Sequence, residues 1–121
     1  MKTLALLLIS YLIIGNSNCT YEVNPVYFIG ETEQIKPESY ELLEKISNFC
    51  NTTDKKIEDI KITYKESVCN KSKDKFLASK RTYLIYEYLK NKIKSKILIK
   101  ISYLDLEIEE SYAEVTPVIG R

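Results

Sequence analysis

The stretch Lys73–Lys92, KDKFLASKRTYLIYEYLKNK, decides the expected fold of this chain. Its apolar side chains recur three or four positions apart, at Leu77, Leu84, Ile85, Tyr88 and Leu89. This spacing predicts an amphipathic helix that packs one face against a core. At about 100° per residue, Arg81 falls near the middle of the apolar face. A guanidinium in that position must extend to solvent, pair inside the protein, or bind an anion.

The choice of arginine at position 81 is itself informative. The chain has 18 Lys plus Arg residues, yet only Arg81 and Arg121 are arginine. Where lysine is the usual base, an inward arginine indicates a need for a planar donor group that can bind two oxygens at once. Two interpretations stay open: an internal carboxylate holds Arg81 for structural reasons, or Arg81 binds a ligand.

Length, charge and composition exclude several classes of protein. At 121 residues we expect a single domain, and a formal charge of +1 does not favour nucleic-acid binding. The chain has no His, which removes Ser-His and Cys-His catalysis and the usual zinc site. The three Cys residues lack the spacing of a metal-ligand cluster. We therefore expect no enzyme activity, no cofactor and no metal.

The N-terminus has the pattern of an export signal. A short positive start precedes the apolar run Leu4–Ile14, which is too short to span a bilayer. Small residues at Gly15 and Ser17 occupy the −3 and −1 positions of a signal-peptidase site. The sequence thus predicts a signal peptide of residues 1–17 and one exported domain of residues 18–121.

The cysteines offer two further expectations. Cys19 would become a lipidated N-terminus if the chain is processed as a lipoprotein, although Asn18 before it is larger than the residue usual there. Cys50 and Cys69 are then left as a pair, and export to an oxidising compartment favours a structural disulfide between them. We expect the protein in the periplasm, anchored to the outer membrane if Cys19 carries lipid. Apart from the signal peptide or such an anchor, no membrane contact is expected.

Strand and helix patterns alternate through the first half of the domain. Tyr21–Ile29 is rich in β-forming residues, with pairing expected to start after Pro25 because proline lacks the N–H. A helix is predicted from Pro37 to about Asn51, since proline is tolerated in the first turn. Apolar and polar residues then alternate over 60–64, which predicts a strand with one buried face.

The second half predicts two further strands after the helix. Ile97–Tyr103 alternates clearly, and the apolar phase shifts at Leu104, which indicates a bulge or a turn into another strand. Val115–Ile119 is expected at an edge because it contains Pro117. The order β-α-β-α-β-(β) predicts an α/β (α+β) fold in which the helices pack on a mixed sheet.

Three matches, covering most of residues 26–93, resemble the OmpA-like C-terminal domain, the peptidoglycan-binding module of outer-membrane protein A and of the peptidoglycan-associated lipoprotein. Val26–Phe28, a loop and then Ile35–Glu38 are similar to the family's first strand and its Leu-x-Pro-Glu helix start. Ile60–Glu66 is similar to the Gly-His-Thr-Asp strand end, with Tyr64 where some members also have Tyr. The family's helix pattern Leu-Ser-x-x-Arg-Ala-x-x-Val-x-x-Tyr-Leu is matched by Leu77, Arg81, Ile85, Tyr88 and Leu89.

The resemblance implies a ligand site. In the family, an Asp binds the ammonium of peptidoglycan diaminopimelate and the Arg binds its carboxylate. By this resemblance, those roles fall on Glu66 and Arg81. Asp74 is a third candidate ligand residue, because it occupies a position near the start of the helix where the family has Asn. A zwitterionic amino-acid end needs one anion and one bidentate cation close together, which agrees with the inward position of Arg81.

Several positions depart from the family pattern. Thr63 replaces the motif Gly, Lys65 its Thr and Glu66 its Asp, while Ala78 and Thr82 replace Ser and Ala on the helix. The family's later Asn-Arg-Arg-Val strand has no clear match here. These losses bear on ligand affinity more than on the fold.

Two functions follow as expectations. The first is an exported cell-envelope module that binds peptidoglycan stem peptides non-covalently through Glu66 and Arg81. The second is a degenerate domain that has lost the ligand, pairs Glu66 with Arg81 internally, and docks to an envelope protein partner through an exposed apolar or Tyr-rich patch. The Lys-rich segment Lys90–Lys100 also offers contact with anionic lipid head groups, although a helix end followed by a strand explains it more simply.

Overall fold

The structure is a computed structural model that describes residues 24–120. The predicted signal peptide, Cys19 and Arg121 lie outside the described residues. The elements follow in the order β1 (Pro25–Val26), α1 (Pro37–Thr52), β2 (Ile57–Ser67), α2 (Leu77–Lys92), β3 (Leu98–Leu106) and β4 (Tyr112–Ile119). No helix within 24–120 has the length and apolar character needed to cross a membrane.

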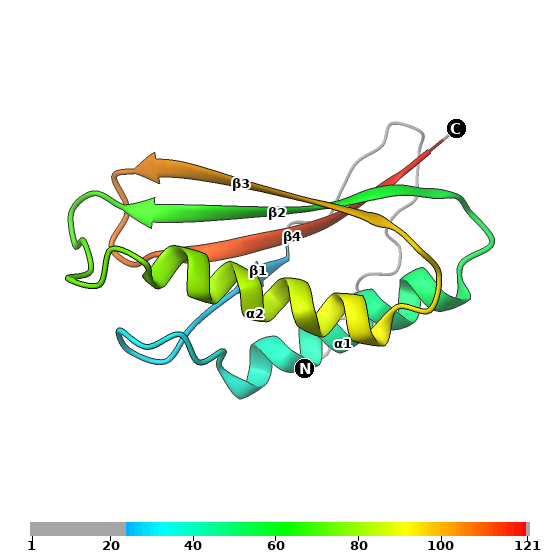
Figure 1. Cartoon of the computed structure of the whole chain (residues 1–121), viewed down its shortest axis with the longest axis horizontal. Coiled ribbons are helices and arrows are strands. Elements are labelled where there is room, and N and C mark those ends of the chain that lie inside the picture. The colour runs from blue at the N-terminus through cyan, green and yellow to red at the C-terminus, as the bar shows by residue number, and fades with distance from the viewer. Residues whose placement is uncertain (1–23, 121) are drawn as a thin grey trace.

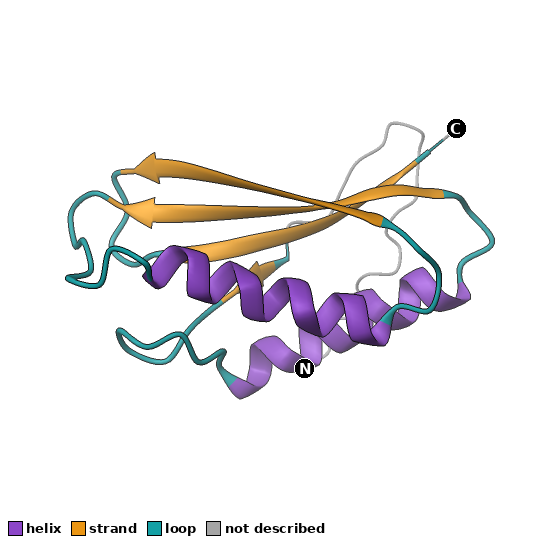
Figure 2. Cartoon of the chain, viewed as in Figure 1, coloured by secondary structure: helices purple, strands orange, loops and turns teal. Residues whose placement is uncertain are grey.

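Both helices cover one face of a four-stranded mixed sheet (Figures 1 and 2). The strand order is β1-β4-β2-β3, with β2 and β3 parallel and the other two pairings antiparallel. α2 is the crossover between the parallel strands, as such a connection requires. This architecture confirms the predicted α+β fold.

The core lies between the helices and the central strand β2. Ile60, Ile62 and Tyr64 alternate along β2 and are at most 1% exposed, because every second side chain points to the helices. Leu43 of α1 and Ile85 of α2 meet them from the other layer and are fully buried. The apolar side chains of the predicted strand pattern and of the predicted helix pattern therefore lie in one common core.

Several element boundaries differ from the sequence expectations. β1 already includes Pro25, which pairs with Glu114, and β4 begins at Tyr112 rather than Val115. β3 continues without a bulge to Leu106, in unbroken parallel register with β2, because the apolar side chains from Leu104 onward lie on the exposed outer face of the sheet. Helix α2 begins at Leu77 rather than Lys73. Before it, the Asp74 carboxylate accepts the Phe76 N–H at 2.9 Å, and this local bond ends the loop.

β4 corrects the expectation of an edge strand. It lies between β1 and β2, and Pro117 pairs with Ile60 of β2. The Val115 N–H points toward β1, where it bonds to the Asn24 carbonyl at 3.0 Å. By strand alternation the nitrogen of Pro117 points to the same side, away from β2, so proline costs the β2–β4 ladder no hydrogen bond.

The predicted Cys50–Cys69 disulfide is not formed. Both thiols are free, Cys50 buried in α1 and Cys69 exposed after β2. Cys50 lies near the end of α1 that leads into β2, whereas Cys69 follows the other end of β2 (Figure 1). Eleven strand residues span about 33 Å, far more than the roughly 7 Å between Cα atoms that a disulfide allows. Burial raises the pKa of the Cys50 thiol to about 12.

Candidate functional site

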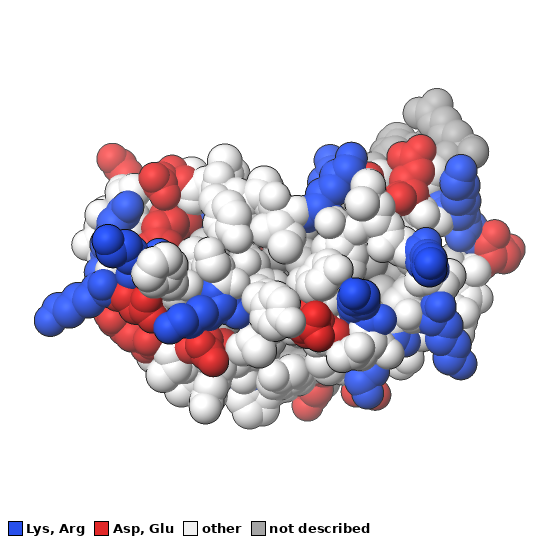
Figure 3. All heavy atoms as spheres, viewed as in Figure 1, with Lys and Arg blue, Asp and Glu red and all other residues white. Residues whose placement is uncertain are grey.

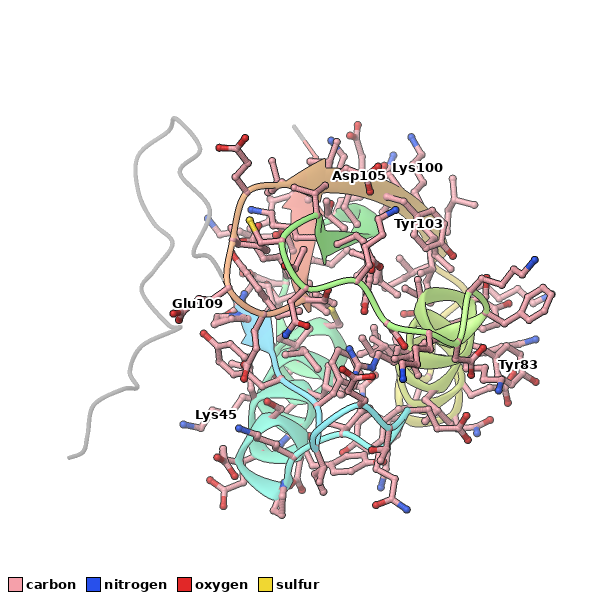
Figure 4. All side chains as sticks on the ribbon, turned by 90° about the vertical axis from the view of Figure 1, so that its left-hand side faces the viewer. Lys45, Tyr83, Lys100, Tyr103, Asp105 and Glu109 are labelled. Atoms are coloured by element: carbon pink, nitrogen blue, oxygen red, sulfur yellow. The ribbon has the colours of Figure 1, made fainter. Side chains whose placement is uncertain are left out.

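Three loops meet at the end of the sheet where β2 and β3 finish. They are residues 28–35, residues 68–76 and residues 107–111. Ser67 ties two of them together: its hydroxyl donates to the Ile108 carbonyl at 2.6 Å and accepts the Asn70 N–H at 2.9 Å. Its own N–H donates to the Ser111 hydroxyl at 2.8 Å. Figure 4 looks onto this end, with Glu109 in the β3–β4 turn.

Arg81 lies beneath these loops and is 4% exposed. Its Nε donates to the Thr32 carbonyl at 2.7 Å, and Nη2 donates to the Gly30 carbonyl at 3.0 Å. Nη1 donates to the Tyr64 hydroxyl at 3.0 Å. The Phe28 ring covers the guanidinium, with Cζ 4.4 Å from the ring centroid. The guanidinium is thus fixed in position from three sides.

The loop over 28–35 is shaped to offer its carbonyls to Arg81. Gly30 has φ +53°, a left-handed conformation that glycine adopts without steric cost. The Thr32 hydroxyl donates to the Ile29 carbonyl at 2.6 Å and accepts the Gln34 N–H at 3.1 Å. A bridge between Phe28 and Ile35 closes the loop. The two carbonyls that hold Arg81 therefore come from a turn that is already locked.

Arg81 has no carboxylate partner among residues 24–120. The ion pairs in that range are Lys65–Glu114, Lys80–Asp74 and Lys100–Asp59. The interpretation in which an internal carboxylate holds Arg81 is therefore wrong for the described chain. Arg81 donates three of its five N–H groups to uncharged oxygens, which leaves one on each Nη atom. Two such N–H groups can receive both oxygens of one carboxylate.

A small cavity of about 40 Å³ opens next to Arg81. Its other lining residues come from the three loops and the ends of the adjoining elements: Phe28, Gly30, Glu31, Tyr64, Asn70, Ser72, Leu77, Glu110 and Ser111. Since one water needs about 10–15 Å³ of such volume, the space admits an end group such as a carboxylate but not a whole sugar or peptide. Glu31 and Glu110 are exposed at this lining and supply negative charge near the cavity.

The other two predicted ligand residues lie elsewhere. Glu66 is half-buried two residues beyond Tyr64, on the same face of β2, and its neighbour across the parallel pair is Asp105. It is not part of the cavity lining. Asp74 pairs with Lys80 at 2.9 Å rather than with Arg81. The Lys80 ammonium and the Phe76 N–H lower the pKa of the Asp74 carboxyl.

Most of the groups that hold Arg81 had no signal in the sequence pattern. Gly30 and Thr32 contribute backbone carbonyls, which no side-chain motif reveals. Tyr64 occupies a motif position of the family that the sequence resembles. Its contact with Arg81 could therefore have been predicted from the sequence. No motif position falls on Glu31 or Glu110. In the part of the chain covered by residues 24–120, no cluster of His, Cys, Asp or Glu is arranged to hold a metal ion.

Comparisons with known proteins support the fold. No family model matches the sequence, and no curated protein matches it. Among solved structures, an outer membrane protein from Borrelia burgdorferi B31 matches with a TM-score of 0.54 and 19% identity. The match covers 85% of this chain and all of the other chain. The chain therefore shares the α+β fold of that outer membrane protein, and at this identity the likeness concerns the fold alone.

Proposed function

We propose that this protein is an exported, OmpA-like cell-envelope module that binds peptidoglycan non-covalently, with Arg81 receiving a carboxylate of the diaminopimelate stem peptide. The observation that carries the proposal is the buried guanidinium of Arg81, which has no carboxylate partner within 24–120 and borders an open cavity. A buried cation without a counter-ion is costly, and a ligand carboxylate would compensate it.

The surroundings of Arg81 fit a zwitterionic amino-acid end. The guanidinium would bind the carboxylate through one N–H of each Nη atom. Glu31 and Glu110, which line the same cavity, would take the ammonium group in place of the Glu66 expected by resemblance. The likeness to an outer membrane protein supports a location in the envelope. Cavity size limits the contact to the end of the stem peptide, so glycan strands would stay outside.

Co-sedimentation with purified diaminopimelate-type sacculi tests this proposal. Wild type should pellet, and free diaminopimelate should release it. Arg81→Lys keeps a positive charge but loses the planar donor group, so we expect it to stay in the supernatant while circular dichroism shows a folded protein. Glu31→Gln and Glu110→Gln should weaken pelleting and Glu66→Gln should not. Pelleting of Arg81→Lys at the wild-type level would refute the site.

A second candidate function is docking to an envelope protein partner, and one observation favours it. Edge strand β3 carries four exposed large apolar side chains, Leu98, Ile101, Tyr103 and Leu104. They are 39–61% exposed on a strand that pairs only with β2. An apolar strand edge of this kind marks an interaction surface. If wild type fails to bind sacculi, crosslinking from position 103 in intact cells would test this candidate. The crosslinked product should be lost in Ile101→Lys, because Ile101 lies on the same face of β3 as Tyr103.

A further inference from the structure

A second, larger hollow of about 520 Å³ lies at the end of the sheet opposite to Arg81. It is open to solvent and is lined by the C-terminal turn of α2, the connection 93–97 and the first residues of β3. Leu89, 0% exposed, and Ile93, 7% exposed, contribute buried apolar surface to it. Ile97 and Ile99 are half-buried and extend this apolar lining onto β3. A hollow of this volume is in the range of small-molecule sites, which are mostly apolar.

The charges at this hollow are all of one sign. Lys90, Lys94 and Lys96 line it, all three exposed, and no Asp or Glu is part of the lining. The ammonium of Lys90 lies 5.6 Å from the centre of the Tyr86 ring, another lining residue. Figure 3 shows lysine side chains gathered over this part of the molecule, where α2 ends and β3 begins. The site is thus apolar within and positive around its opening.

Two backbone N–H groups at the start of the connection 93–97 are bonded within the chain. The Lys94 N–H donates to the side-chain oxygen of Asn51 on α1 at 2.8 Å, and the Asn51 amide donates to the Lys92 carbonyl at 2.9 Å. The Ile93 N–H donates to the Leu89 carbonyl at 2.9 Å. The N–H groups of Ile93 and Lys94 are therefore not available to a peptide backbone, whereas a hydrocarbon chain brings no polar groups that need partners.

We propose that this hollow binds an anionic amphiphile, a single acyl chain whose head-group carboxylate lies among Lys90, Lys94 and Lys96. Its apolar lining takes the chain, and the lysines provide the charge complementary to the head group. Each buried methylene should strengthen binding about fourfold. This site is separate from Arg81 and does not depend on peptidoglycan binding.

Isothermal titration with oleate below its micelle concentration tests the proposal. The protein is used as recovered from cells, with its N-terminal boundary read by mass spectrometry. We expect saturable binding of one oleate per chain, and binding of oleyl alcohol at least tenfold weaker because it lacks the charge. Replacing all three lysines by Gln should weaken oleate binding at least tenfold, and Ser95→Trp, which fills the hollow from an exposed lining position, should abolish it.

A matched control comes from the other end of α2. Lys71, Lys73 and Lys75 are also exposed, and their triple Gln variant removes the same charge without touching the hollow. It should bind oleate as wild type does, and the variants at the hollow should pellet with sacculi unchanged. Equal weakening in both triple variants, or no saturable oleate binding, would overturn the proposal. Binding to phosphatidylglycerol vesicles but not to free oleate would overturn it too, because it would show surface attraction rather than occupation of the hollow.

Discussion

Replacing Arg81 by Met is the perturbation that most directly tests how the loop over 28–35 is held. Methionine keeps an apolar stem against Phe28 and removes all three donated hydrogen bonds. Hydrogen bonds from a charged donor contribute about 1.5–3 kcal/mol each, and relief of the buried cation's desolvation offsets several kcal/mol of that sum. We expect a net loss of about 2–4 kcal/mol of unfolding free energy.

The size of the loss depends on the acceptors left behind. Gly30 and Thr32 are exposed residues, so water can replace Arg81 at their carbonyls. The Tyr64 hydroxyl belongs to a residue 1% exposed and would stay unpaired, at a cost of about 1–3 kcal/mol. Adding Tyr64→Phe to Arg81→Met should therefore cost less than the sum of the two single changes.

Thermal and urea unfolding measure this loss. For a domain of this size, 2–4 kcal/mol corresponds to a fall in Tm of about 10–25 °C. Lys80→Met is the matched control, since Lys80 is the neighbour on α2 and pairs only with exposed Asp74; it should change Tm little. Amide exchange in 28–35 should also speed up in Arg81→Met alone. If both variants have the same Tm and the same loop exchange, the account of Arg81 is refuted.

Three further predictions follow from single contacts. A thiol reagent should modify Cys69 at once and Cys50 only on unfolding, because Cys50 is buried with a raised pKa. Modification of Cys50 in the native protein, read by peptide mass spectrometry, would contradict this. The Lys80 ammonium and the Phe76 N–H lower the pKa of Asp74, so its carboxylate contributes stability above the ordinary pKa of 3.8, and this contribution is lost as the pH falls through the lowered pKa. Because the pair is exposed, Asp74→Asn should make the acid limb of the Tm–pH curve only slightly shallower; a steeper limb would contradict this. Gly30→Ala should lower the free energy of unfolding by about 1–2 kcal/mol because of the φ of +53° alone, since no atom lies near the added carbon. A urea midpoint equal to that of wild type would count against this loop conformation.

The fold was largely predictable because its elements repeat a simple period. The pattern over 77–92 and the alternation over 60–64 each bury one face, and the structure shows those same faces in the core. The position of β4 was not predictable from Pro117. A proline rules out one ladder bond, and the short β1 leaves the side of β4 next to Pro117 without a described partner strand. Proline therefore excluded a hydrogen bond on one side of β4 only, and the other side of β4 pairs with β2.

The candidate site was predictable only in part. Helical spacing placed Arg81 on the inner face, and the structure buries it. The sequence leaves two partners open for it, an internal carboxylate such as Glu66 or the carboxylate of a ligand, because arguments from charge look for the opposite charge. The structure uses the carbonyls of Gly30 and Thr32 instead. Backbone acceptors have no residue signature, so their arrangement appears only with the loop conformation.

The side-chain NMR signal of Arg81 tests most sharply whether this guanidinium binds the stem peptide. Arg81 and Arg121 are the two arginines of the chain, so the Nε–H region can be assigned with one Arg121→Lys variant. On titration with a diaminopimelate-containing stem peptide, we expect the Arg81 signals to shift in a saturable way while the Arg121 signal stays fixed. An Arg81 signal that stays fixed while the stem peptide binds, or no binding at millimolar peptide, would contradict it.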